Sequence, residues 1–159
     1  MGITLARIDN RLLHGIVATQ WAPISNCTRL MVIDDKVAAD PVLKESMKLA
    51  RPVGVALSII SEETALANLS AKKYEGQKIF VVTKNPSTLL KVLQTGETIP
   101  KIIIGGTVSI EGGTVLSSRA MASQEDLEAY KAIASYKVPV RIQYVPADKE
   151  IPLESVVEI

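Results

Sequence analysis

Histidine and cysteine each occur once in this 159-residue chain, as His14 and Cys27. A single cysteine excludes an internal disulfide, and the two residues together are too few for a zinc site built from histidine and cysteine ligands. Any active site that needs two histidines is excluded as well. A metal site built from carboxylates alone stays open.

The chain also lacks an excess of either charge, because 18 Lys and Arg oppose 17 Asp and Glu and leave a net charge of +1. This balance argues against binding of nucleic acid or anionic lipid by the whole surface, although a local basic patch stays open. The most apolar stretch, Val53–Ile60, is far short of the ~20 residues that span a bilayer. Met1–Leu5 has neither the basic nor the long apolar part of a signal peptide. We expect a cytosolic protein with no direct membrane insertion and no nucleic-acid partner.

Hydrophobic residues make up 47% of the chain, and its length predicts one domain over residues 1–159. Short aliphatic runs predict strands over residues 3–8, 29–33, 55–60, 78–82, 101–104 and 140–145. Helical stretches alternate with them and begin near Gly15, Asp40, Ser61, Asn85 and Ser123. This alternation predicts the α/β class, with a parallel sheet covered by helices on both faces.

The segment from Gly105 to Ser118 is the least regular, and its two glycine pairs predict a short hairpin around Val108–Ile110. In parallel sheets of this kind, ligands bind beyond the carboxyl ends of the strands. That rule selects the polar residues that follow the predicted strands: Asp9–His14, Asp34–Lys36, Ser61, Thr83–Asn85 and Gly105–Val108.

The first of these loops carries the densest chemistry, Arg7-Ile-Asp-Asn-Arg-Leu-Leu-His14-Gly. A neutral imidazole offers one nucleophilic nitrogen, and two guanidinium groups bind a phosphate in bidentate fashion. Asp9 suits bracing of an arginine or fixing of the imidazole tautomer. Backbone N–H groups of the loop, around Asn10, and of a helix start form a second anion cradle, where Gly15 permits close approach or a positive φ. Together they suit a histidine that accepts and releases a phosphoryl group.

Structural interpretations stand beside this functional one. His14 alone is more often a structural hydrogen-bonding residue, and Arg7 with Asp9 would make an ordinary surface pair. Ser61, Thr83 and Asn85 suit rim contacts near the site or helix caps. Two leucines beside the histidine, Leu12 and Leu13, are expected to anchor the loop in the core.

The loop resembles the signature of a known family, the IIB component of the mannose/fructose/sorbose family of the bacterial phosphotransferase system (PTS), R-[IV]-D-[DN]-R-L-[IV]-H-G-Q-V. Trp21 follows the loop at the usual distance. The segment Val32–Asp40 is similar to the family's "VVDD…VA.D", and Ile142–Asp148 resembles its "IQ.VP.D". The likeness spans nearly the whole chain.

The resemblance implies an open, mainly parallel sheet of about seven strands with helices on both faces, and a phosphoryl carrier for sugar uptake. By position, His14 is the phosphorylated residue, at Nδ1, Arg11 binds the phosphoryl group, and Arg7 and Asp9 shape the loop. The implied partners are a IIA protein as donor and the membrane components IIC and IID, which deliver the sugar and hold the chain at the inner membrane face. No cofactor or metal is implied.

Two features depart from the family pattern, and two alternatives stay open. Ile16 replaces the usual Gln, and the Asn that often precedes the glycine of the 104–108 segment is missing. One alternative is a homologue impaired in transfer that only binds partners. The other is a receiver-type aspartyl phospho-acceptor, in which Asp34 and Asp35 would hold Mg²⁺, although here the third strand ends without an aspartate. Otherwise this aspartate pair lies at the rim of the loop or caps local backbone.

Overall fold

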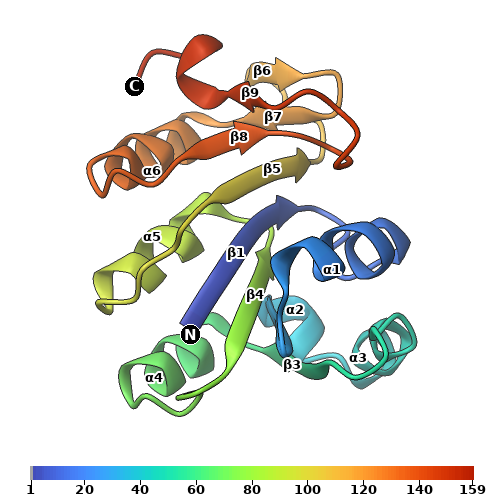
Figure 1. The fold of residues 1–159 in the computed structure, drawn as a ribbon. Helices are drawn as coiled ribbons and strands as arrows, with labels where there is room; N and C mark the ends of the chain where they lie inside the picture. The colour runs from blue at the N-terminus through green and yellow to red at the C-terminus, as the bar shows by residue number, and fades with distance from the viewer. Residues whose placement is uncertain (1) are drawn as a thin grey trace.

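A seven-stranded sheet with helices on both faces organises the chain (Figure 1). The computed structural model describes residues 2–159, and Met1, which the predicted domain includes, lies outside the described residues. Neighbouring strands run parallel except the last pair, which is antiparallel. In spatial order the strands are β3 (Ala56–Ile60), β2 (Arg29–Ile33), β4 (Lys78–Thr83), β1 (Gly2–Asp9), β5 (Ile102–Gly106), β8 (Val140–Ile142) and β9 (Ile151–Pro152). The predicted α/β architecture is therefore confirmed.

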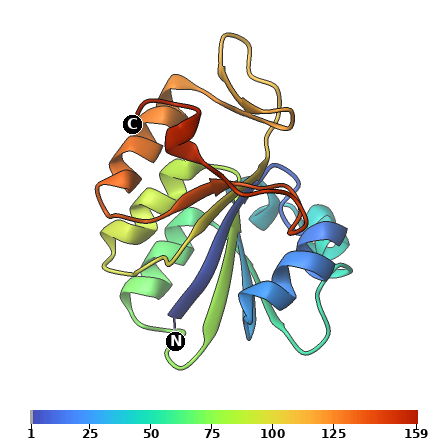
Figure 2. The ribbon, with the colours of Figure 1, turned by 45° about the horizontal axis from the view of Figure 1, so that its top comes forward.

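The helices divide between the two faces of this sheet, as Figures 1 and 2 show. One face is covered by α4 (Glu62–Ser70), α5 (Pro86–Gln94) and α6 (Gln124–Ala134), whose apolar residues join one buried cluster. A second cluster on the opposite face includes residues of the π-helix η1 (Val17–Trp21), α1 (Ala22–Ser25) and α2 (Asp35–Ala38), with α3 (Pro41–Lys48) packed at its margin. A short 3-10 turn, η2 (Leu153–Ser155), lies near the C-terminus.

Three of the predicted helix starts are confirmed by side-chain caps. The Asp40 side chain accepts hydrogen bonds from two backbone N–H groups of the first turn of α3. Ser61 caps α4, and Ser123 forms a reciprocal capping box with Asp126 at the start of α6. Each cap satisfies N–H groups that a helix start leaves unpaired, which stabilises the helix by about 1 kcal/mol. Asn85 takes the cap position of α5 without a side-chain hydrogen bond.

The hairpin predicted around Val108–Ile110 is wrong. That segment has no regular structure, and the hairpin lies further on, with β6 (Thr114–Ser117) paired antiparallel to β7 (Ala120–Ala122). Leu116, Ala120 and Ala122 fix this placement, because they join the buried cluster that also holds residues of α6. Figure 2 shows the hairpin standing beyond the carboxyl ends of β1 and β5.

Two further differences concern short elements. The strand predicted to reach residue 145 ends at Ile142. The two-residue β9 and the four-residue α2 were not predicted, since elements of this length carry no measurable periodicity. No helix within residues 2–159 is long and apolar enough to cross a membrane.

Candidate functional site

The loop that follows β1 is anchored in the core by two consecutive leucines between Arg11 and His14. Leu12 and Leu13 are buried as predicted, at 1% and 4% exposure. Leu12 adopts a positive φ of 58°, a conformation that is costly for a leucine and is found where the surrounding structure enforces it. The chain turns there and leads directly into the helical segment that begins at Gly15. The loop geometry is therefore imposed by packing.

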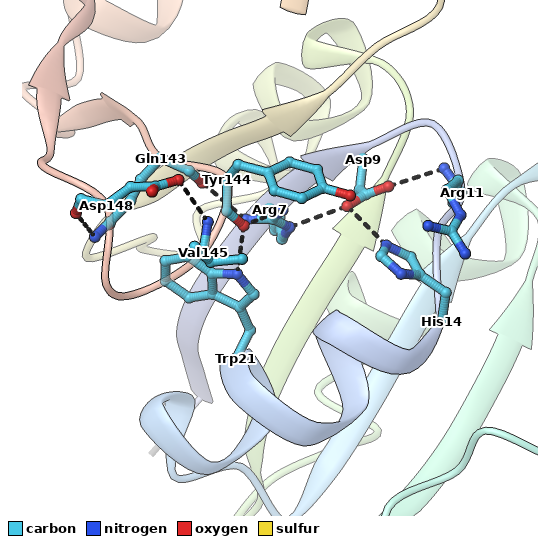
Figure 3. Close-up of polar contacts among 9 residues, drawn as sticks. All are labelled: Arg7, Asp9, Arg11, His14, Trp21, Gln143, Tyr144, Val145 and Asp148. Atoms are coloured by element: carbon cyan, nitrogen blue, oxygen red, sulfur yellow. Dashed lines mark hydrogen bonds and ion pairs between the residues drawn. The ribbon is translucent and has the colours of Figure 1, made fainter. Parts of the chain in front are cut away.

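Arg7 lies in the central strand β1 and is fully buried. Its Nε donates to Asp9 Oδ2 at 3.2 Å, and its two terminal nitrogens donate to the carbonyls of Gln143 at 3.0 Å and Tyr144 at 2.8 Å (Figure 3). Burial lowers the pKa of Arg7, and the neighbouring Asp9 carboxylate partly offsets this shift. The interpretation of Arg7 and Asp9 as a surface pair is therefore wrong, since this pair is buried and ties β1 to the segment after β8.

Gly105 provides the space that Arg7 occupies. A Cβ atom built on this glycine would lie 2.1 Å from a terminal nitrogen of Arg7, closer than any real contact. The pairing of β1 with β5 is irregular here, because Ile8 pairs with Ile104 and Asp9 with Gly106. Such a bulge redirects side chains next to functional sites. The glycine pair therefore has a packing role that its sequence did not reveal.

Trp21 and Tyr144 complete the enclosure of Arg7. The guanidinium carbon lies 4.9 Å from the Trp21 ring centroid, and Trp21 Nε1 donates to the Tyr144 carbonyl at 3.0 Å. The segment 143–148 is held in turn by Gln143 Nε2, which donates to the carbonyls of Pro146 and Asp148. The residues alone did not predict these supports. The only signals for them were Trp21 and the Ile142–Asp148 match in the resemblance.

Asp9 connects the buried arginine to the histidine. Its Oδ2 lies 3.0 Å from His14 Nε2, and its Oδ1 accepts from the Arg11 backbone N–H at 2.9 Å (Figure 3). Burial raises the pKa of Asp9, but the hydrogen bonds from His14 and Arg11 and the charge of Arg7 outweigh it, so the net shift of this pKa is downward. Asp9 is thus a carboxylate at neutral pH and only accepts hydrogen bonds.

His14 is held in one orientation by this carboxylate. Because Asp9 accepts at Nε2, the neutral imidazole carries its proton on Nε2 and its lone pair on Nδ1. Nδ1 is buried and has no hydrogen-bond partner within residues 2–159. A buried polar atom left unpaired costs about 1–3 kcal/mol, and such atoms are concentrated at reactive positions. The structural role considered for His14 leaves this unpaired nitrogen without an explanation.

Arg11, Asn10 and Gly15 form the open side of the loop. Arg11 is exposed, and its guanidinium has no ion pair or hydrogen bond to any described residue; Figure 3 shows it beside the imidazole. The Asn10 backbone N–H donates to Gly106. Gly15 does not have the positive φ considered for it, and an added Cβ there would meet nothing within 4 Å. The loop therefore offers one free cation and open space next to the histidine.

The rim residues selected from the sequence make mostly structural contacts. Asp34 accepts from Val37 N–H at the start of α2, and Asp35 accepts from Glu62 N–H at 2.8 Å. Ser61 caps α4, and Thr83 is buried at the end of β4. Ile16 packs against the apolar cluster of its own face. In the part of the chain that the structure describes, no three His, Cys, Asp or Glu side chains gather in an arrangement that would hold a metal ion.

Comparison with known proteins places these features in context. Residues 3–159 match the model of a family described as "PTS system sorbose subfamily IIB component". The chain is 31% identical to the sorbose-specific EIIB component of Lacticaseibacillus casei, over 93% of this chain and 90% of that protein. It is 29% identical to the mannose-specific EIIAB component of Escherichia coli K12, over 96% of this chain and 47% of that protein. The chain thus spans about half the length of the mannose-specific relatives.

A solved structure agrees with the same grouping. The IIBSor domain of the sorbose permease from Klebsiella pneumoniae superposes with a TM-score of 0.89 and 29% identity, over 98% of this chain and 95% of that one.

Proposed function

Because the chain belongs to the sorbose subfamily of PTS IIB components, we propose that it is a sugar phosphotransferase component in which His14 Nδ1 carries the phosphoryl group. The observation that carries this proposal is the unpaired, buried Nδ1 atom opposite the Asp9–Nε2 hydrogen bond. A nucleophile needs a free lone pair at a fixed position, and Asp9 supplies the orientation. Its role resembles that of the aspartate that orients a catalytic histidine in other enzymes.

The first step takes the phosphoryl group from a phosphohistidine of a IIA protein. The lone pair of His14 Nδ1 attacks phosphorus, a new N–P bond forms, and the donor's N–P bond breaks with its electron pair returning to the donor imidazole. The Nε2 proton stays between His14 and Asp9, which stabilises the positive charge that develops on the ring. Arg11, the free cation of the loop, binds the equatorial oxygens in bidentate fashion.

In the second step, a sugar hydroxyl delivered by the IIC and IID membrane components attacks the same phosphorus. The His14 N–P bond breaks, its electron pair returns to Nδ1, and the hydroxyl proton is released to water. N–H groups at the start of the helical segment that begins at Gly15 contribute to the anion cradle, whereas the Asn10 and Arg11 N–H groups are committed to the Gly106 carbonyl and to Asp9. Arg7 does not reach the phosphoryl group in this scheme, because its donors are committed to Asp9 and two carbonyls.

We further propose that residues 1–159 form one IIB domain that works in the cytoplasm and reaches the inner membrane face through its partners. A carrier that meets two proteins in turn needs interfaces of modest area. The exposed Arg11 side of the loop suits such brief contacts. A homologue impaired in transfer would bind its partners but accept no phosphoryl group. The labelling experiment described next therefore distinguishes it from a working carrier.

The test is phosphoryl labelling. The chain is incubated with a radiolabelled phospho-IIA protein, and acid-labile label is measured for the wild type, His14→Ala and Asp34→Asn. We expect label on the wild type and on Asp34→Asn and none on His14→Ala, with circular dichroism showing that all three fold. Label that persists in His14→Ala refutes the proposal, and label that requires Asp34 supports the receiver-type alternative. Nitrogen NMR of the labelled chain then distinguishes Nδ1 from Nε2.

A further inference from the structure

A groove of about 540 Å³ lies next to the histidine loop, between Asn10 and Arg11 on one side and the β6–β7 hairpin on the other. Its volume falls in the range of small-molecule sites. The groove opens between the segments that follow β1 and β5, which are neighbours in the sheet. The chain leaves β1 toward α1 on one face and leaves β5 toward α6 on the other. Such a switch in direction is where ligands bind in open α/β sheets.

Two free cations line this groove. Arg119, in the turn of the hairpin, is exposed and stacks on the Tyr144 ring with its guanidinium carbon 4.0 Å from the ring centroid. Like Arg11, its side chain has no ion pair or hydrogen bond with a residue in the 2–159 range. None of the lining residues is Asp or Glu. An uncompensated pair of guanidinium groups without any acid favours an anionic ligand, and their fork geometry suits phosphate.

Hydroxyl groups form most of the remaining polar lining, at Thr107, Ser109, Ser117, Ser118 and Tyr144. The hydroxyls of Ser109, Ser118 and Tyr144 have no hydrogen-bond partner among the described residues. Free hydroxyls beside an aromatic ring complement the hydroxyl groups of a sugar. The groove thus combines phosphate-binding and polyol-binding chemistry within reach of the histidine loop, with Arg11 shared between the two.

We propose that this groove binds a phosphorylated sugar, with its phosphate held by Arg11 and Arg119 and its hydroxyl groups by the serines. The identity of the ligand rests on the proposed function, because a sugar phosphate is what transfer from His14 produces. A product held beside the unphosphorylated histidine occupies Arg11 and competes with the next phosphoryl group. A high concentration of sugar phosphate would therefore slow the phosphorylation of His14.

The test measures binding directly on the ¹⁵N-labelled, unphosphorylated chain by NMR. Mannose 6-phosphate is the probe, and mannose and inorganic phosphate are the comparison ligands. We expect saturable shifts of the Thr107 and Arg119 amide signals with mannose 6-phosphate, about 10-fold weaker binding of inorganic phosphate, and none of mannose. Arg119→Gln should weaken the binding of mannose 6-phosphate about 10-fold, and Arg51→Gln, an exposed arginine outside the groove, should leave it unchanged.

Three results overturn the inference: no saturable shift up to about 10 mM, equal binding of inorganic phosphate, or an Arg119→Gln variant that binds mannose 6-phosphate like the wild type. If Arg119→Gln instead slows labelling by phospho-IIA while sugar phosphate binding is unchanged, the groove is a protein-docking surface. The binding assay needs no transfer, so the two proposals fail separately. A chain that accepts label but binds no sugar phosphate refutes only the groove, and the reverse result refutes only the carrier function.

Discussion

Arg7 near the end of β1 and Arg11 in the loop that follows stand four positions apart, yet their surroundings are opposite. Arg7 is fully buried and uses its donors on Asp9 and the carbonyls of Gln143 and Tyr144. Arg11 is exposed, and its guanidinium contacts none of the described acidic side chains. Arg7 thus supports the site from within the core, whereas Arg11 faces the solvent. A sequence motif that contains both arginines does not reveal which is which.

The largest expected difference is in stability. Arg7→Gln leaves Asp9 as a buried charge without its cation and two carbonyls without donors, so we expect a loss of about 3–5 kcal/mol in the free energy of unfolding. Arg11→Gln should change it by no more than about 0.5 kcal/mol. Urea unfolding of both variants measures this. Equal losses of unfolding free energy in the two variants would show that Arg7 does not contribute more to stability than Arg11.

The second expected effect concerns the space for Arg7. Gly105→Ala places a Cβ atom 2.1 Å from the Arg7 terminal nitrogen and should destabilise the chain by about 2 kcal/mol, because the guanidinium must move. It should also slow labelling of His14 through the displaced Asp9. Gly15→Ala is the matched control for stability alone, since its Cβ meets nothing within 4 Å but Gly15 borders the proposed phosphoryl site. If Gly105→Ala unfolds and labels like the wild type, Arg7 does not position the histidine.

The third prediction concerns the open arginine. Arg11→Lys keeps the charge but loses the bidentate fork, so phosphoryl transfer should slow about 10-fold, equivalent to about 1.4 kcal/mol in the barrier, while the unfolding free energy stays the same. The single-turnover rate of labelling by phospho-IIA measures this, with Arg51→Lys as control. Unchanged kinetics would mean that Arg11 does not bind the phosphoryl group in the transition state.

The smallest expected effect is on the pH dependence of the free energy of unfolding. The pKa of Asp9 is lower in the folded chain than its ordinary value, so the unfolded chain binds more protons in acid. The stabilisation from this carboxylate is therefore present above the unfolded pKa of about 3.9 and is lost as the pH falls through the folded pKa. The free energy of unfolding, measured with urea between about pH 5 and 3, should decline less steeply for Asp9→Asn than for the wild type. Parallel declines would show that Asp9 is not the titrating group.

Features that depend on neighbouring residues could be predicted from the sequence alone. Strand and helix order followed from apolar periodicity and from local caps such as Asp40, Ser61 and Ser123, because these signals act between residues a few positions apart. The loop motif identified His14 and its neighbours. The glycine pairs predict a hairpin at residues 108–110, but it lies at residues 114–122, because such pairs mark turns and do not show which flanking residues the core buries.

The polar residues at the rim of the site show a second limit of prediction from sequence. Polar residues at strand ends are good candidates for a site, yet Asp34, Asp35 and Ser61 each accept a hydrogen bond from a backbone N–H group. The groove beside the loop was not anticipated, because Arg119 comes from the hairpin and Tyr144 from the segment after β8.

By itself the sequence determined the α/β class, the order of the elements and the motif that holds the histidine. Only the tertiary structure decided that Arg7 is buried, that Gly105 makes room for it, and that Asp9 leaves Nδ1 of His14 as the free nitrogen. The reason is the order of the strands, which places β1 beside β5 and brings the 143–148 segment onto Arg7. The contact of Arg7 with Tyr144, 137 positions away, depends on that arrangement and leaves no local signal in the chain.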